Sequence, residues 1–208
     1  KRVSGLIPLK KLVYLISPNK INNKFYSELD MVLSYGNVKF FQLRLKKIKS
    51  KNLIKISNKV RKITSRHGVK FLINDYCDLV LKSKADGCHL GQLDGSINAA
   101  KKKLKNKILG VTCHNSMELA KNAIKDKASY LAFGSFFKSK LKPNAKKANI
   151  SILKWAKKNT KKPIVVIGGI NNLNYKKLIK SGAKYIAISS YIWDNPKLKP
   201  ELAIRKFK

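Results

Sequence analysis

Residues 163–191 read PIVVIGGINNLNYKKLIKSGAKYIAISSY, and this segment decides the fold class. Two short apolar runs, residues 163–167 and 185–188, flank a lysine-bearing stretch whose apolar residues recur at helical spacing over residues 173–179. An apolar strand followed by a helix and a second apolar strand is the repeating unit of a parallel sheet that helices cover. The segment therefore predicts one β/α unit and the strand of the next.

The same alternation extends along the whole chain, with further helical spacing over residues 50–66 and 117–124. The apolar runs are residues 12–16, 39–43, 70–73, 87–90, 108–111, 130–133, 163–167 and 185–188. Eight such units favour a (β/α)₈ TIM barrel, a closed eight-stranded parallel sheet. An open doubly wound sheet is the alternative. It would normally carry a glycine-rich turn after the first strand, where this chain has SPNKINN.

Length and composition predict a single domain over residues 1–208. The chain is 44% hydrophobic and 27% charged and shows no linker-like tract. No apolar stretch approaches the roughly 18 residues that span a bilayer, so we expect an uncleaved cytoplasmic protein without membrane contact. The cysteines, Cys77, Cys88 and Cys113, are odd in number and far apart, so we expect them to be reduced.

The formal net charge of +37 suggests, taken alone, a nucleic acid or another anionic surface as partner. Nearly all the basic residues are lysines, however, whereas proteins that read phosphates and bases rely heavily on arginine. We therefore interpret the lysines as solvated residues on outer helix faces and expect no nucleic-acid partner. The charge would still attract small phosphorylated substrates.

Polar and glycine-rich segments follow the apolar runs, at the strand ends where barrel enzymes build their sites. Gly168-Gly169 follows the seventh run, and Ser189-Ser190 follows the eighth. Many barrels bind phosphate at this place through backbone N–H groups, and glycine lets the anion approach closely. Tight turns selected for packing are the alternative, but the paired elements favour a phosphate site.

Two carboxylates stand just beyond predicted strand ends in a chain with only ten acidic residues. Asp75 follows LIN and Asp94 follows GQL. Helix capping would explain either residue alone, whereas their joint placement predicts a partial Mg²⁺ shell that water and substrate oxygens complete.

Gln42, Arg44 and Lys46 alternate at the end of the second run, so as strand residues they would point to one side. A guanidinium and an ammonium together suit a diphosphate group. The dipeptides Cys88-His89 and Cys113-His114 raise a zinc site as an alternative. Neighbours on a strand point in opposite directions and no CxxC accompanies them, so the sequence argues against zinc.

Several segments in one order resemble the thiamine-phosphate synthase family over about residues 12–193. These segments are FFQLRLKK, FLINDYCDLVLKSKADGCHLGQLD, ILGVTCHNSMELAKNAI, YLAFGSFFKSKLK, PIVVIGGINNLN and GAKYIAISSYI. The resemblance implies a (β/α)₈ barrel that joins 4-amino-5-hydroxymethyl-2-methylpyrimidine diphosphate to 4-methyl-5-(2-phosphoethyl)thiazole and releases pyrophosphate. It also implies Mg²⁺ as the cofactor and a dissociative reaction without a protein nucleophile.

The resemblance further implies roles for individual residues. Asp75 and Asp94 would bind Mg²⁺, and Arg44, Lys46 and Lys142 would act in catalysis on the departing pyrophosphate. The pyrimidine diphosphate would be bound by Gln42, Arg44, Lys46, Asn74, Thr112 and Lys142. Ser139, which matches the first Thr of the family's Thr-x-Thr-Lys loop, would also bind substrate. The thiazole phosphate would be bound by Gly169, Ile188 and Ser189, largely through backbone N–H groups.

The chain departs from the family pattern at three places. Leu45 stands where the family has Glu, Leu141 where it has Thr, and Leu93 where an acidic residue usually precedes the second metal Asp. Thiazole tautomerase of the same superfamily is the alternative function, with His114 as its acid or base. The Asp75, Asp94 and Lys142 set argues against an isomerase, which has little need for a metal–diphosphate site. A nucleic-acid binder is a more distant alternative.

Overall fold

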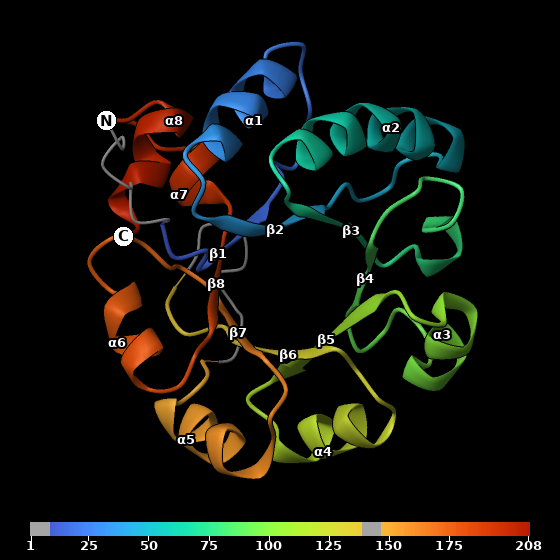
Figure 1. Cartoon of the computed structure of the whole chain (residues 1–208). Helices are drawn as coiled ribbons and strands as arrows, with labels where there is room; N and C mark the ends of the chain where they lie inside the picture. Colours follow the sequence, from blue (N-terminus) through green and yellow to red (C-terminus); the bar gives the residue numbers. More distant parts are fainter. Residues whose placement is uncertain (1–8, 139–146) are drawn as a thin grey trace, which may run out of the picture.

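The computed structural model describes residues 9–138 and 147–208 of the chain. Eight parallel strands form a closed barrel in chain order, and β1 pairs with both β2 and β8 (Figure 1). The strands are β1 Val13–Ile16, β2 Val38–Leu43, β3 Lys70–Asn74, β4 Gly87–Leu90, β5 Ile108–His114, β6 Tyr130–Phe133, β7 Ile164–Ile167 and β8 Tyr185–Ile188. The predicted closed barrel is confirmed, and the open sheet is wrong.

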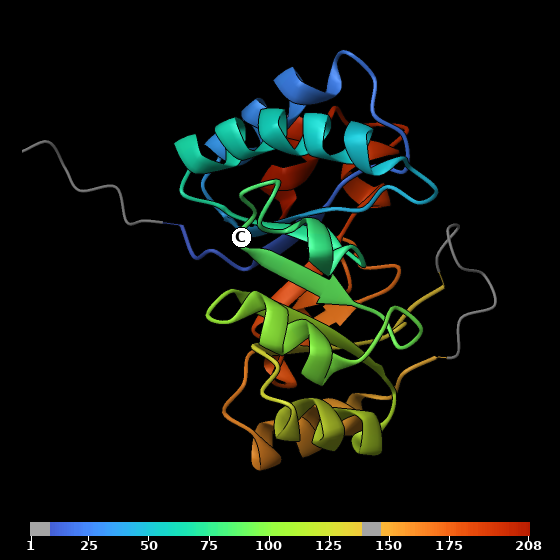
Figure 2. The same ribbon diagram turned by 90° about the vertical axis from the view of Figure 1, so that its right-hand side faces the viewer.

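Helices surround the barrel on its outside, as both ribbon views show (Figures 1 and 2). They are α1 Phe25–Ser34, α2 Ser50–Arg66, α3 Ile97–Leu104, α4 Met117–Lys125, α5 Ile150–Asn159, α6 Tyr175–Lys180, α7 Ser190–Trp193 and α8 Pro200–Ala203, with 3₁₀ turns η1 Cys77–Leu79 and η2 Ile204–Lys206. The connection between β3 and β4 holds only η1 in place of an α-helix. Among the described residues, no helix has both the length and the apolar character of a membrane span.

Strand alternation separates two apolar layers. Val13 and Leu15 of β1 belong to the large core between the sheet and the helices, whereas Tyr14 points into the barrel. The interior layer consists of Tyr14, Ile16, Phe40, Leu72, Tyr130, Ala132, Val165, Tyr185 and Ala187. Its aromatic rings contact one another, with the Phe40 and Tyr185 centroids 5.2 Å apart. The interior is therefore a packed core that closes the barrel below its carboxyl end.

Gly110 on β5 makes room for the Tyr130 ring of this interior layer. A Cβ at residue 110 would lie 1.9 Å from Cζ of Tyr130 and 2.1 Å from its hydroxyl oxygen. Both distances are far below van der Waals contact, so the Tyr130 ring occupies the space that a side chain at 110 would need. Glycine is therefore required in the middle of this strand by packing.

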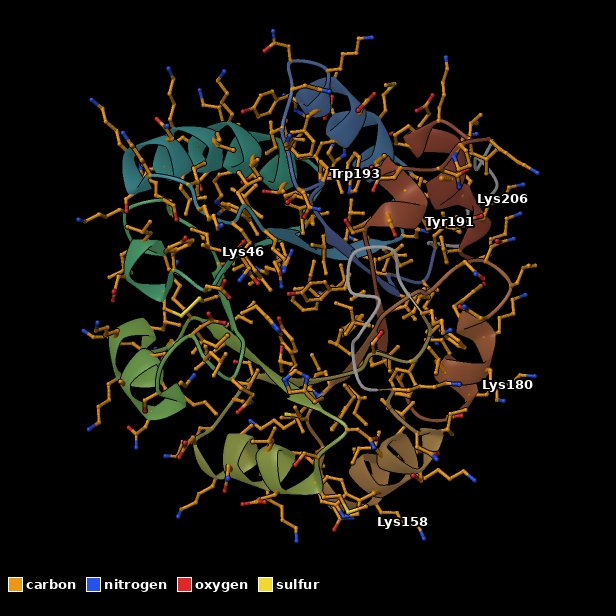
Figure 3. The ribbon with its side chains drawn as sticks, turned by 180° about the vertical axis from the view of Figure 1, so that it is seen from behind. Lys46, Lys158, Lys180, Tyr191, Trp193 and Lys206 are labelled. Atoms are coloured by element: carbon orange, nitrogen blue, oxygen red, sulfur yellow. A yellow bond between two sulfur atoms is a disulfide. The ribbon has the colours of Figure 1, made fainter. Side chains whose placement is uncertain are left out.

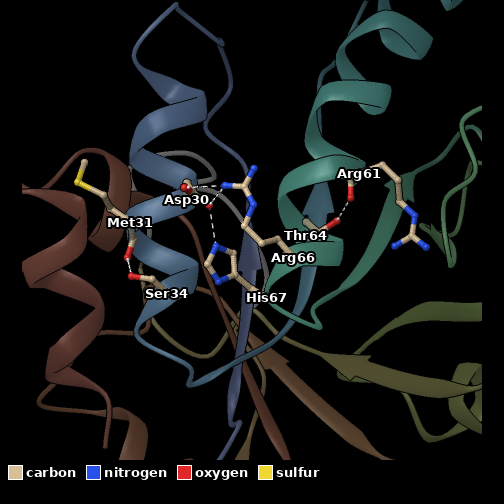
Figure 4. Close-up of polar contacts among 7 residues, drawn as sticks. All are labelled: Asp30, Met31, Ser34, Arg61, Thr64, Arg66 and His67. Carbon is tan, nitrogen blue, oxygen red and sulfur yellow. Dashed lines mark hydrogen bonds and ion pairs between the residues drawn. The ribbon is translucent and has the colours of Figure 1, made fainter.

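A polar cluster links α1 to the end of α2 (Figure 4). Asp30 accepts hydrogen bonds from the Arg66 guanidinium at 3.0 Å and lies 2.7 Å from Nε2 of His67. The His67 hydrogen bond, followed by the Arg66 charge, holds the pKa of Asp30 below its usual value. Arg66 is exposed, so this cluster mainly fixes how the two helices meet.

The cysteines differ from the sequence expectation. Cys77 of η1 and Cys88 of β4 form a disulfide, and Cys113 is free and buried. The expectation that all are reduced is therefore wrong for this pair. The 11-residue separation of the two cysteines did not predict the disulfide, because the pairing depends on how η1 turns the chain back. That turn brings the two Cα atoms to 5.4 Å, within the range of a disulfide.

Replacing Gly110 by Ala should destabilise the barrel, because the methyl group would collide with the buried Tyr130 ring. We expect a loss of about 1–3 kcal/mol in the free energy of unfolding, measured by urea denaturation. The penalty should shrink in a Tyr130→Leu background, where the ring is absent. An equal penalty in both backgrounds would show that the Gly110–Tyr130 contact is not its cause.

Candidate active site

A cavity opens at the carboxyl end of the strands, where the loops of the sequence prediction converge. It is lined by Tyr14, Ile16, Gln42, Arg44, Lys46, Asn74, Asp75, His89, Gly91, Asp94, Thr112, Ala132, Val165, Ile167 and Ala187. One wall is small and apolar, and the other carries charged and hydrogen-bonding groups. Figure 3 shows Lys46 at the rim of the barrel opening, while Lys158 and Lys180 lie on the outside.

The second strand supplies the cationic part of the cavity. Gln42 is buried near the end of β2, and Arg44 and Lys46 follow it on the same side. Leu45 points the other way and packs in the core between sheet and helices. The alternation expected from the sequence is thus present, and the departure at Leu45 faces away from the cavity.

The two predicted metal ligands lie close together at the ends of β3 and β4. Asp75 adopts a left-handed backbone with φ of 66°, and its amide donates to the carbonyl of His89 at 2.9 Å. Asp94 folds back so that Oδ2 accepts from the Gly91 amide at 2.9 Å. A Cβ at residue 91 would lie 2.5 Å from the same oxygen, so glycine permits this return.

Asp75 and Asp94 place two negative charges close together, and a bound cation would relieve the repulsion between them. Burial raises the pKa of Asp94 above its usual value, and the hydrogen bond and charge of Asp75 raise it further. Lys46 contacts Asp75 with 2.5 Å between Nζ and Oδ2, although the lysine side chain is 53% exposed. An ammonium therefore occupies part of the place where a cation would lie.

The donor set fits Mg²⁺ better than zinc. No group of three or more His, Cys, Asp or Glu side chains gathers within residues 9–138 and 147–208. Two carboxylates beside an open cavity leave positions for water and substrate oxygens, which Mg²⁺ prefers. Cys88 is consumed by the disulfide and Cys113 is buried, so the structure gives the Cys-His dipeptides no zinc site.

His89 lines the cavity but is absent from the site residues predicted from the sequence, which named it only as the neighbour of Cys88 in a Cys-His dipeptide. His89 points into the barrel, where its ring stacks on Tyr130 with 18° between the planes. Burial, as the largest effect, lowers the pKa of His89 to about 4, so the imidazole is neutral at pH 7. The alternation of side chains along a strand could have identified His89. Cys88 faces the outer core, so the next residue on the strand must face the barrel interior.

The expected phosphate elements lie at the ends of β7 and β8, beside the lining of the cavity. Gly169 has a left-handed φ of 58°, and a Cβ there would lie 2.4 Å from the Lys138 carbonyl oxygen. Ser189 donates its hydroxyl to the Ser17 carbonyl at 3.0 Å. Within the described residues, the amide N–H groups of Gly169 and Ser189 donate to no protein group. The side chain of Ile188 packs outward in the core.

Seven of the predicted site residues line one cavity: Gln42, Arg44, Lys46, Asn74, Asp75, Asp94 and Thr112. Gly169, Ile188 and Ser189 lie outside its lining, at the neighbouring strand ends. Ser139 and Lys142 lie outside the described residues.

Replacing Asp75 by Asn should lower the pKa of Asp94 toward its usual value. The change removes the neighbouring negative charge and frees Lys46 to act on Asp94, although burial continues to raise the pKa. Carboxyl ¹³C NMR titration without added metal measures it. The matched control is Asp78→Asn, because Asp78 is exposed and pairs with Lys103. An unchanged Asp94 pKa in the Asp75 variant would contradict the paired-carboxylate arrangement.

Comparisons with known proteins identify the family of this chain. Residues 13–192 match the family described as thiamine monophosphate synthase. The thiamine-phosphate synthase of Pelagibacter ubique is 56% identical over 96% of this chain and 97% of its own, and that of Erythrobacter litoralis is 38% identical over 87% of each. A solved thiamine phosphate pyrophosphorylase from Pyrococcus furiosus superposes with a TM-score of 0.84 at 27% identity, over 97% of this chain and 95% of that one. The chain therefore belongs to the thiamine monophosphate synthase family.

Proposed function

We propose that this chain is a thiamine-phosphate synthase that joins the pyrimidine diphosphate to the thiazole phosphate and releases pyrophosphate. The single observation that carries the proposal is the cavity itself. It combines two cationic side chains and two carboxylates at the carboxyl end of one barrel. Its uncharged hydrogen-bonding side chains are Gln42, Asn74, His89 and Thr112. Family membership supplies the reaction class, and the cavity supplies the groups that the reaction needs.

The reaction breaks the bond between the pyrimidine methylene carbon and the diphosphate oxygen, and the electron pair leaves with pyrophosphate. The thiazole nitrogen then gives its lone pair to the methylene carbon and forms the new C–N bond. Arg44 and Lys46 would hold the diphosphate and offset the charge that grows on it. Lys142 is proposed as a third cation on the same group.

Asp75 and Asp94 would hold Mg²⁺, which supplies further positive charge to the diphosphate. Burial raises the pKa of Asp94 most, and the hydrogen bond and charge of Asp75 raise it further. The closeness of the two carboxylates supports this role, because a cation between them would offset their repulsion. The apolar wall formed by Ile16, Ala132 and Val165 would receive a flat ring and exclude water from the reacting carbon.

The second phosphate would lie at the ends of β7 and β8. Gly169 and Ser189 present amide N–H groups there that donate to no described protein group. This arrangement supports backbone binding of the thiazole phosphate, with the two substrates entering from adjacent sectors of the barrel mouth.

The tautomerase alternative receives less support. His114, its proposed acid or base, is exposed at the end of β5 and is not among the residues that line the cavity. A tautomerase would change the thiazole substrate without the pyrimidine diphosphate. Omitting that substrate therefore separates the two functions.

Release of pyrophosphate, followed directly by ³¹P NMR so that no Mg²⁺-dependent coupling enzyme is needed, tests the function and the metal together. With both substrates present, we expect release with Mg²⁺, none in excess chelator, and recovery when Mg²⁺ is restored. Full activity in excess chelator would exclude the metal role. Conversion of the thiazole substrate alone, without pyrophosphate release, would favour the tautomerase.

Replacing Lys46 by Met should lower kcat by about 10²-fold, because one charge that stabilises the departing pyrophosphate is lost. The Mg²⁺ concentration for half-maximal activity should not rise, since Lys46 contacts Asp75 and competes with a cation there. Lys49→Met is the matched control, because Lys49 is exposed at the start of α2. Equal kcat values for Lys46→Met and Lys49→Met would show that Lys46 does not stabilise the departing pyrophosphate.

A further inference from the structure

Five side chains form a hydrogen-bonded chain across the barrel interior. The bonds join Gln42 to Tyr14 at 2.7 Å, Tyr14 to Tyr130 at 2.7 Å, Tyr130 to His89 at 2.8 Å and His89 to Thr112 at 2.9 Å. The members come from five different strands. Both ends, Gln42 and Thr112, line the cavity.

The first bond sets the direction of the whole chain. The amide Nε2 of Gln42 can only donate, so the Tyr14 oxygen accepts. Tyr14 then donates its own hydrogen to Tyr130, because no other described group contacts that hydroxyl. Tyr14 and Tyr130 are 1% and 2% exposed, so a misdirected hydrogen would have no water to bond.

The remaining bonds follow from this start. Tyr130 accepts from Tyr14 and therefore donates to Nδ1 of His89, which must be unprotonated. The ring hydrogen of His89 then lies on Nε2 and is donated to Oγ1 of Thr112. Since Thr112 accepts from inside the barrel, its own hydrogen is directed to the cavity. At the other end, the Gln42 Oε1 atom accepts from no described group.

We propose that His89 is a positioning residue that fixes the Thr112 hydroxyl as a donor toward the pyrimidine and, through the same hydrogen-bonded chain, keeps the accepting Oε1 atom of Gln42 turned toward the cavity. The proposal rests on the function proposed above. A 4-aminopyrimidine offers the complementary pair, a donating amino group beside an accepting ring nitrogen. A 4-oxopyrimidine offers the reverse pair, an accepting oxygen beside a ring N–H. The directed chain therefore selects the amino ring over the oxo ring.

Packing holds the imidazole in this role. The Tyr130 ring stacks against it with 5.7 Å between the centroids, and Gly110 leaves the space that this ring needs. Accepting an oxo ring would require Gln42 to turn its amide and every later hydrogen to reverse. Because the four bonds run head to tail, the tautomer of His89 reports the direction of the entire chain.

The direct test is ¹⁵N NMR of the full chain carrying ring-labelled histidine, without substrates. The sequence has three histidines, and His67→Gln and His114→Gln assign the other two. We expect the His89 hydrogen on Nε2 in the wild-type chain and a mixture of tautomers in Tyr130→Phe, which lacks the donor to Nδ1. A hydrogen on Nδ1 in the wild type would overturn the proposal.

Kinetics test the consequence for specificity. We expect His89→Leu to raise the KM for the pyrimidine diphosphate about tenfold and to reduce the preference for it over its 4-oxo analogue by a similar factor, the value of one hydrogen bond. The KM for the thiazole phosphate should stay unchanged. His89→Gln should retain most of the preference, because its amide can donate to Thr112.

The outcomes separate the role of His89 from a purely structural one. If His89→Leu fails to fold, Thr112→Val removes the same donor at constant shape and should show the same loss of preference. Equal changes in both KM values with an unchanged preference would reject the proposal. A wild-type chain that forms no product from both substrates would instead reject the proposed function, while the NMR result would still decide the direction of the chain.

Discussion

Closure of the parallel sheet is the constraint on which the rest of the structure depends. The pairing of β1 with β8, Val13 opposite Ile186 and Leu15 opposite Ile188, brings the first and last strands together. Because all strands are parallel, their carboxyl ends then meet at one end of the barrel. The closure also joins loops that are distant in sequence, as in the bond from Ser189 to the Ser17 carbonyl. Every group of the cavity is positioned by this one closed ladder.

Filling a closed barrel creates a second requirement, because the interior is too narrow for arbitrary side chains. This chain fills it with rings, and a ring as large as Tyr130 fits only because β5 carries Gly110. The hydroxyl groups of Tyr14 and Tyr130 are enclosed in this layer and must be paired. Gln42 and His89 pair these buried hydroxyl groups. The same bonds fix the direction of the hydrogen bonds that reach the cavity. Packing and recognition thus use the same atoms.

Much of this arrangement could be predicted from local pattern, and the reasons are physical. The boundaries of α2 agree with the predicted residues 50–66, because a 17-residue amphipathic helix repeats its pattern several times. Gln42, Arg44 and Lys46 were predicted to share a side because a strand has a period of two. The disulfide was missed since it depends on how η1 turns, and the His89 contacts were missed because they join strands that are far apart in sequence. Local periodicity indicates which way a side chain faces, but not which side chain it meets.

The net charge of +37 acts differently from the charges of the cavity. Lysines of α5 and α6, including Lys157 and Lys180, line a groove on the outside of the barrel. Such surface charges are screened over about 8 Å at physiological ionic strength, so they favour the approach of anionic substrates without ordering them. Within the cavity, burial raises the pKa of Asp94, and the neighbouring Asp75 raises it further although Lys46 lies close by. A strongly basic chain can therefore keep a site for a divalent cation, because the local pair of acids, and not the sum of all charges, sets the potential where the cation would bind.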